Sequence, residues 1–70
     1  MTSSKKAAGI FKEARLSKGL TQTEVADKAG IHPNTYAKIE RGISKPLPSS
    51  IKRLIKALDI DPSKVISLLD

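Results

Sequence analysis

The chain has 70 residues, which is room for one domain with a single small hydrophobic core. Its 13 lysine and arginine residues against 7 acidic ones give a net charge of +6, which favours an anionic partner: nucleic acid first, a membrane surface second. The absence of cysteine excludes disulfides and thiolate metal sites and fits a reducing cytosol, so we predict a cytoplasmic protein. No apolar run is long enough to span a bilayer or to form a signal peptide, and we expect a soluble, unprocessed protein.

The first predicted helix covers residues 5–18 and follows a mobile arm of residues 1–4. Gly19 ends this helix, and Leu20 fills the corner before the next one. The inward stripe of the helix recurs at helical spacing and consists of Ala7, Ala8, Phe11, Ala14 and Arg15.

The second predicted helix, residues 22–29, has clear signals at both ends. Thr21 and Glu24 form a capping-box pattern, in which the hydroxyl and the carboxylate each accept a backbone N–H of the first turn. Gly30 follows the last apolar residue, at the position where helices commonly end in a left-handed residue. Between these signals a narrow apolar stripe is formed by Val25, Ala26 and Ala29.

The third predicted helix, residues 33–41, begins at Pro33 and ends before Gly42. At about 100° per residue, its inner face carries Tyr36, Ile39 and Glu40. The opposite face carries one amide and two cations, Asn34, Lys38 and Arg41, which are side chains able to reach base edges and phosphates in a DNA major groove. The alternative is an ordinary solvated helix face.

Two further helices complete the predicted fold. Residues 48–58 begin at Pro48 and carry the strongest amphipathic pattern, with one face formed by Ile51, Leu54, Ile55 and Leu58. Asp61 and Pro62 form an N-cap followed by a first-turn proline, which predicts a fifth helix over residues 62–69 with Val65, Ile66 and Leu69 inward. The sequence shows no strand-like alternation and no repeat, so we predict an all-α domain of five short helices over residues 5–70.

Positive charge is concentrated in the middle of the sequence. Between residues 38 and 56 the only acidic residue is Glu40, whereas the cations are Lys38, Arg41, Lys45, Lys52, Arg53 and Lys56. From Asp59 onward the chain is neutral to acidic. The predicted basic region therefore adjoins the third helix and the loop that follows it.

The sequence gives little support to catalysis or metal binding. His32 is the only histidine, and without cysteine or clustered carboxylates nearby it cannot build a zinc site. A serine, histidine and aspartate arrangement can be drawn with Ser17 or Ser44, but nothing activates either hydroxyl. Glycine-rich phosphate loops are absent. We predict that the protein is not an enzyme and uses no cofactor and no metal.

A longer pattern runs through most of the chain, from Ala7 to Ile66. It consists of Arg15, Gly19-Leu20-Thr21-Gln22, Glu24-Val25-Ala26, Ala29-Gly30-Ile31, Ile39-Glu40-Arg41-Gly42, Pro46, Leu54, Ala57-Leu58 and Ile60. Each piece is weak alone, but in this order and spacing the sequence resembles the Cro/CI-type (XRE-like) helix-turn-helix repressors of phages and bacteria.

The resemblance implies a compact, lambda-repressor-like domain that binds operator DNA, usually as a two-fold dimer, with residues 33–41 in the major groove. It assigns base-reading positions to Pro33, Asn34, Thr35 and Lys38. It assigns phosphate contacts to Gln22, His32 and Lys45, and Arg41 on the outer helix face is a further cation for the phosphates. Because many relatives carry a polar residue at position 33, Pro33 is expected to pack on a thymine methyl group instead of hydrogen bonding to a base.

The resemblance also pairs Arg15 with Glu40, and the residues themselves support this pairing. Glu40 turns toward the packed face, where a carboxylate needs a partner or a raised pKa, and Arg15 can supply a bidentate partner from the first helix. The alternative is a surface glutamate. For Tyr36 we expect a buried ring with its hydroxyl at the rim, in reach of a phosphate; the alternative is that the whole side chain belongs to the core.

The leading functional prediction is a sequence-specific DNA-binding transcriptional regulator whose partner is double-stranded operator DNA. One alternative is a helix-turn-helix protein-interaction adaptor or antitoxin-like module, with an apolar patch that includes Leu47 and Leu68. Another is a basic binder of nucleic acid or membrane surface without sequence preference. We expect a homodimer formed through the C-terminal helix, with Leu68 at the seam or, alternatively, simply exposed.

Overall fold

The computed structural model describes the backbone of residues 3–64 and the side chains of residues 8–64. Its four α-helices are α1 (Ser3–Ser17), α2 (Gln22–Ala29), α3 (Pro33–Glu40) and α4 (Pro48–Leu58), followed by one 3₁₀ turn, Pro62–Lys64. No strand occurs in the part of the chain that is described. The prediction of an all-α fold is confirmed.

The predicted number of helices and some boundaries need correction. The described residues form four α-helices where five were predicted, and Pro62 opens a 3₁₀ turn in place of the predicted α-helix over 62–69. The predicted inward residues Val65, Ile66 and Leu69, and Leu68 of the expected dimer seam, lie outside the described residues. Helix α1 begins at Ser3, so it overlaps the predicted arm of residues 1–4. Helices α2 and α4 have the predicted bounds, and α3 ends one residue early because Arg41 is its C-cap.

Local hydrogen bonds explain why α2 begins and ends where it does. The Glu24 N–H donates to Thr21 Oγ1 at 3.1 Å, and the Thr21 N–H donates to Glu24 Oε1 at 2.8 Å, so the predicted capping box is present. The hydrogen bond from the Thr21 backbone lowers the pKa of Glu24. At the other end Gly30 adopts φ +70°, and Ile31 N–H donates to Ala26 O at 3.0 Å, which turns the chain toward α3.

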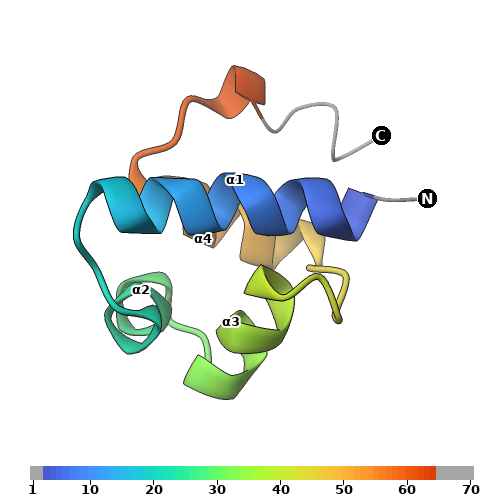
Figure 1. The fold of residues 1–70 in the computed structure, drawn as a ribbon, viewed down its shortest axis with the longest axis horizontal. Helices are drawn as coiled ribbons and strands as arrows, with labels where there is room; N and C mark the ends of the chain where they lie inside the picture. The colour runs from blue at the N-terminus through green and yellow to red at the C-terminus, as the bar shows by residue number, and fades with distance from the viewer. Residues whose placement is uncertain (1–2, 65–70) are drawn as a thin grey trace.

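The four helices pack around one core. Helices α2 and α3 lie on one side of α1, and the segment after α4 lies on the other side (Figure 1). All four helices contribute to the core, whose fully buried large side chains are Phe11, Val25, Tyr36, Ile39, Leu54 and Leu58. Because α3 packs inward through Tyr36 and Ile39, its opposite face is left open. No helix in the described residues is long and apolar enough to cross a bilayer.

Alanine substitutions at Gly30 and Gly9 are expected to have opposite effects on stability. Gly30→Ala should lower the free energy of unfolding by about 1 kcal/mol because φ +70° is unfavourable for a residue with a Cβ. Space is not the cause, since the added Cβ would lie 3.8 Å from Arg53 Nη1. Gly9→Ala should raise the free energy of unfolding by roughly 0.5–1 kcal/mol. Gly9 lies in the interior of helix α1 with its surface exposed to solvent, and an added Cβ would meet nothing within 4 Å. Urea denaturation measures both; equal signs would contradict this account.

Candidate nucleic-acid interface

The outer face of α3 is formed by side chains that protrude into solvent. The four residues assigned to base reading, Pro33, Asn34, Thr35 and Lys38, are all exposed. Tyr36, Ile39 and Glu40, on the predicted inner face, are all buried. The helical period therefore divides these seven residues as the sequence predicts, and the amide and the ammonium group share an open surface.

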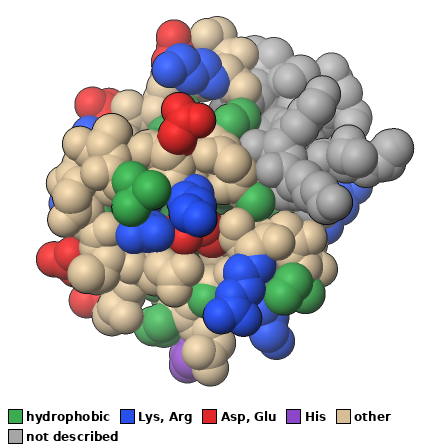
Figure 2. Space-filling model, viewed as in Figure 1, with side chains coloured by type: hydrophobic (Ala, Val, Ile, Leu, Met, Phe, Trp, Pro, Cys, Tyr) green, Lys and Arg blue, Asp and Glu red, His purple; other side chains and the backbone are tan. Residues whose placement is uncertain are grey.

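A basic surface adjoins the C-terminal end of α3. Arg41 caps the helix, Lys45 follows in the loop to α4, and both are exposed, as is Lys38 one turn earlier. Figure 2 shows lysine and arginine side chains gathered where α3 ends and this loop begins. We call Lys38, Arg41 and Lys45 the basic rim of α3. Within the described residues none of the three forms an ion pair, so each can bind an external anion.

The N-terminus of α2 offers backbone donors to an anion. The N–H groups of Gln22 and Thr23 have no acceptor among the described residues, because the capping box serves Thr21 and Glu24 instead. Such free donors, together with the helix dipole, favour a phosphate at this end of a helix. The Gln22 side chain, however, donates from Nε2 to Glu40 Oε1 at 3.0 Å, a contact that the sequence did not predict.

Arg15 and Glu40 form a bidentate ion pair between α1 and α3. Arg15 Nε lies 2.7 Å from Glu40 Oε2, and Arg15 Nη2 lies 2.8 Å from Glu40 Oε1. A third donor, Nη1, reaches the carbonyl oxygen of Leu20 at 2.9 Å. Only 4% of the Glu40 side chain and 13% of the Arg15 side chain remain exposed. The pair therefore links the end of α3 to α1 and to the corner that leads into α2.

The ionised form of Glu40 is stabilised by its donors. Burial alone raises the pKa of the Glu40 carboxyl, but the hydrogen bonds from Arg15 and Gln22 and the nearby Tyr36 hydroxyl act in the other direction, and the net pKa is lowered. The predicted position of the Tyr36 hydroxyl at the rim is wrong. Tyr36 is fully buried, and its hydroxyl has no hydrogen-bond partner among the residues that the structure describes. Burial together with the Glu40 carboxylate raises its pKa. Tyr36 is thus a core residue.

Glu40→Gln is expected to change how stability depends on pH. Because the folded pKa of Glu40 lies below the ordinary value of about 4.3, its contribution is complete above that value and is lost as the pH falls through the folded pKa. The free energy of unfolding of Glu40→Gln should therefore fall less steeply below about pH 4 than that of the wild type, although the variant is less stable at pH 7. Urea denaturation across this range measures the slope.

The control for this prediction is Glu13→Gln, which removes an exposed carboxylate from α1 that forms no hydrogen bond with the described residues. Its pH profile should run parallel to that of the wild type. Parallel profiles for Glu13→Gln and Glu40→Gln alike would show that Glu40 contributes nothing to acid sensitivity.

A second group of cations lies away from the reading face. Lys28 of α2 and Arg53 and Lys56 of α4 line a hollow of about 400 Å³, with two alanines between them. Arg53 Nη1 also donates to the carbonyl oxygen of Gly30 at 3.4 Å. The sequence grouped the basic residues of α4 with those of α3, but packing places Arg53 and Lys56 beside α2. The basic surface next to α3 is therefore smaller than the sequence indicated.

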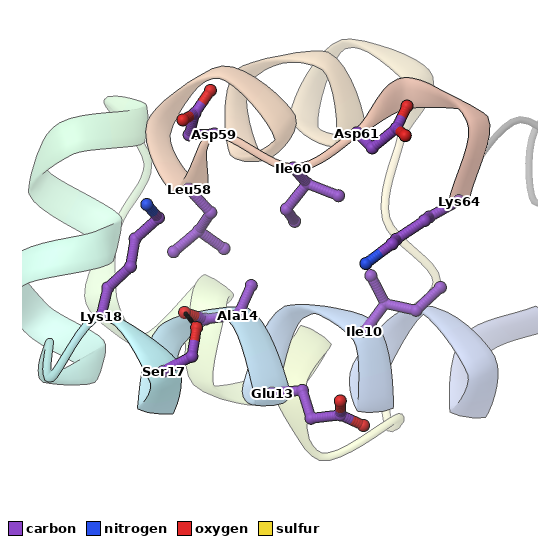
Figure 3. A pocket seen from close by; sticks show the side chains of 10 residues that line it. All are labelled: Ile10, Glu13, Ala14, Ser17, Lys18, Leu58, Asp59, Ile60, Asp61 and Lys64. Atoms are coloured by element: carbon purple, nitrogen blue, oxygen red, sulfur yellow. Dashed lines mark hydrogen bonds between the residues drawn. The ribbon is translucent and has the colours of Figure 1, made fainter.

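A groove between α1 and the segment after α4 is lined by both apolar and charged side chains. Ile10 and Ala14 of α1 face Leu58 and Ile60 across it, and charged side chains of both signs stand at its edges (Figure 3). Its volume is about 300 Å³. Because opposite charges alternate there, the groove lacks the single-sign field of a phosphate site. No three acidic or histidine side chains of the described residues converge in a way that could hold a metal ion.

Two signals in the sequence could have revealed more of this arrangement. His32 stands directly before a first-turn proline, which marks it as the N-cap of α3; its Nδ1 accepts the Asn34 N–H at 3.1 Å. Gln22 directly follows the N-cap of α2, which brings its amide close to the corner where Arg15 donates to Leu20. The contact between Arg53 and Gly30 has no comparable signal in the sequence.

A helix, a glycine turn and a second helix with an open, polar and basic face define a DNA-binding transcriptional regulator of the helix-turn-helix class. The sequence profile of the helix-turn-helix family HTH_3 matches residues 11–65, and the chain belongs to this family. The resemblance to XRE-like helix-turn-helix regulators is thereby confirmed.

Two similar solved structures are point mutants of the restriction-modification controller protein C.Esp1396I. The mutant with a tyrosine changed to alanine has a TM-score of 0.86 and 24% identity, covering 99% of this chain and 91% of its own. The mutant with a tyrosine changed to phenylalanine has a TM-score of 0.85 and 26% identity, covering 99% of this chain and 89% of its own. Among curated proteins, no significant match to this chain was found.

Proposed function

We propose that this protein controls transcription by placing α3 in the major groove of an operator and reading its sequence through Asn34, Thr35 and Lys38. The observation that carries this proposal is the exposed outer face of α3 beside a basic rim that forms no ion pair within the described part of the chain. An asparagine can bind adenine through two hydrogen bonds, and a lysine can donate to guanine, so these side chains suit direct readout. Pro33 has no donor and contributes an apolar contact with a thymine methyl group.

The phosphate contacts come from both ends of the reading helix and from α2. The free N–H groups of Gln22 and Thr23 suit one phosphate, and Arg41 and Lys45 of the basic rim suit others. One N–H of the Gln22 side chain is occupied by Glu40, so its second side-chain N–H is the one left for DNA. These contacts fix the position of α3 on the duplex but do not select a sequence.

A homodimer on a two-fold operator is part of the same proposal. A domain of this size contacts DNA over a small area, and two copies spaced one helical turn apart would double that area. We also propose a cytoplasmic location and a regulatory role in place of a catalytic one, both of which fit a protein that binds operator DNA. The similar structures are controller proteins by name, which supports regulation as the role.

The proposal is tested by selecting bound duplexes from a random DNA pool. Anisotropy titrations on the selected operator and on a scrambled duplex then measure the preference. We expect a preference of about 10³-fold or more, and affinity that falls steeply with salt because counterions are released. Salt-dependent binding without preference would indicate a non-specific basic protein. No selected DNA, together with a protein partner retained at high salt, would favour the adaptor alternative.

A further inference from the structure

His32 is both the N-cap of α3 and an exposed side chain beside the reading face. It is the N-cap of α3, with φ −66° and ψ 139°, and its Nδ1 accepts the backbone N–H of Asn34 at 3.1 Å. It is also exposed, at the end of the helix from which base-reading side chains project. The residue whose N–H it holds is the one asparagine on the reading face.

The capping bond fixes the chemistry of the imidazole. The ring nitrogen Nδ1 accepts a hydrogen bond, so it must carry a lone pair and not a proton. In a neutral imidazole the single ring proton is therefore on Nε2. Nε2–H has no acceptor among the described residues and is a donor available to an external oxygen. Phosphate oxygens are acceptors only, and they surround a helix that enters the major groove.

Few other backbone hydrogen bonds hold the first turn of α3, so the two His32 contacts contribute most of its local hydrogen bonding. Pro33 has no N–H, and the Tyr36 N–H donates to the His32 carbonyl oxygen at 3.0 Å. Only the N–H of Thr35 is left without an acceptor in the described first turn. The start of α3 is therefore held by the two His32 contacts, one through the imidazole and one through the carbonyl oxygen.

We propose that His32 is a positioning residue for operator recognition: Nδ1 holds the backbone of Asn34, whose side chain reads a base, while Nε2–H donates to a DNA phosphate. Binding of that phosphate thus fixes the ring that holds the backbone from which the base-reading side chain projects. This inference rests on the proposed function, because it requires α3 to enter the major groove. It goes beyond a simple phosphate contact because it makes sequence preference depend on a residue that touches no base.

Two variants separate the two nitrogens. Asparagine places an acceptor near the position of Nδ1 and is a good N-cap, but it has no group at the position of Nε2. Glutamine places a donor near the position of Nε2 but caps poorly. The readout is the ratio of affinities for the selected operator and a scrambled duplex, measured by anisotropy near pH 8. This ratio does not depend on the folded fraction, so loss of stability alone cannot change it.

We expect His32→Asn to bind both duplexes several-fold more weakly and to keep its preference within about threefold. We expect His32→Gln to bind scrambled DNA as the wild type does and to lose about fivefold or more of its preference, the low end of the cost of one impaired base contact. Equal behaviour of the two variants, or unchanged preference in both, would overturn the role of His32 while leaving the proposed function intact. A wild-type protein without preference would instead overturn the proposed function itself.

Discussion

Arg15→Met should leave the domain largely unfolded at 25 °C. The substitution strands the Glu40 carboxylate, which is 4% exposed and has lost both hydrogen bonds of its bidentate partner. Removing one member of a buried ion pair costs about 3–5 kcal/mol, and a single small core supplies roughly 3–5 kcal/mol in total. Circular dichroism at 222 nm with urea denaturation measures the loss. A melting temperature within about 4 °C of the wild type, equivalent to roughly 1 kcal/mol, would contradict it.

Two further variants show whether the cause is the stranded charge. Arg53→Met makes the same chemical change at an exposed arginine with one long hydrogen bond to Gly30, and it should cost less than about 1 kcal/mol. The double variant Arg15→Met with Glu40→Met removes both charges and should be more stable than Arg15→Met alone, because no buried carboxylate is left without a partner. A double variant as unstable as the single one would show that packing, and not charge, dominates at this site.

Asn34→Ala should weaken binding to the selected operator about 5- to 150-fold and leave binding to scrambled DNA nearly unchanged. This range corresponds to the loss of one bidentate base contact, about 1–3 kcal/mol. Asn34 is exposed, and its side chain forms no hydrogen bond with the described residues, so the substitution should not disturb the fold. Parallel anisotropy titrations on the two duplexes measure the difference. An unchanged operator preference would remove Asn34 from the reading residues.

Arg41→Ala is the matched control on the same helix face. Arg41 is assigned to a phosphate, so its loss should weaken binding to both duplexes equally and reduce the slope of log affinity against log salt by about 1. A loss confined to the operator would instead make Arg41 a base-reading residue. The pair of variants therefore separates reading of the sequence from attraction to the backbone.

The ends of α2 and α4, the start of α3 and the outward face of α3 could be predicted from the sequence. The Thr21–Glu24 capping box, Pro33 and Pro48 at first helical positions, and Gly30 after α2 are interactions among residues within a few positions of each other. Such signals depend mainly on neighbouring residues, although the same kind of signal at Asp61 and Pro62 opens only a 3₁₀ turn. For the same reason, the helical period alone separates Asn34 and Lys38 from Tyr36 and Ile39.

The pairing of Arg15 with Glu40, 25 positions apart, was accessible because a carboxylate on an inner face demands a partner and because the sequence pattern points to an arginine. The hydrogen-bond partners of uncharged side chains could not be predicted from the sequence in this way. In the sequence, Gln22 and Tyr36 each had several plausible hydrogen-bond partners. Only the packing of α1, α2 and α3 brings the Gln22 side-chain amide within hydrogen-bonding distance of Glu40 and buries the Tyr36 hydroxyl.

The distribution of charge also depended on tertiary structure. Along the sequence Arg53 and Lys56 belong to the basic region around α3, but the packing of α4 against α2 turns them toward Lys28. A count along the chain cannot predict this, because the direction of a helix face is set by the helix that it packs against. Tertiary packing therefore separates Arg53 and Lys56 from the basic rim of α3, which consists of Lys38, Arg41 and Lys45.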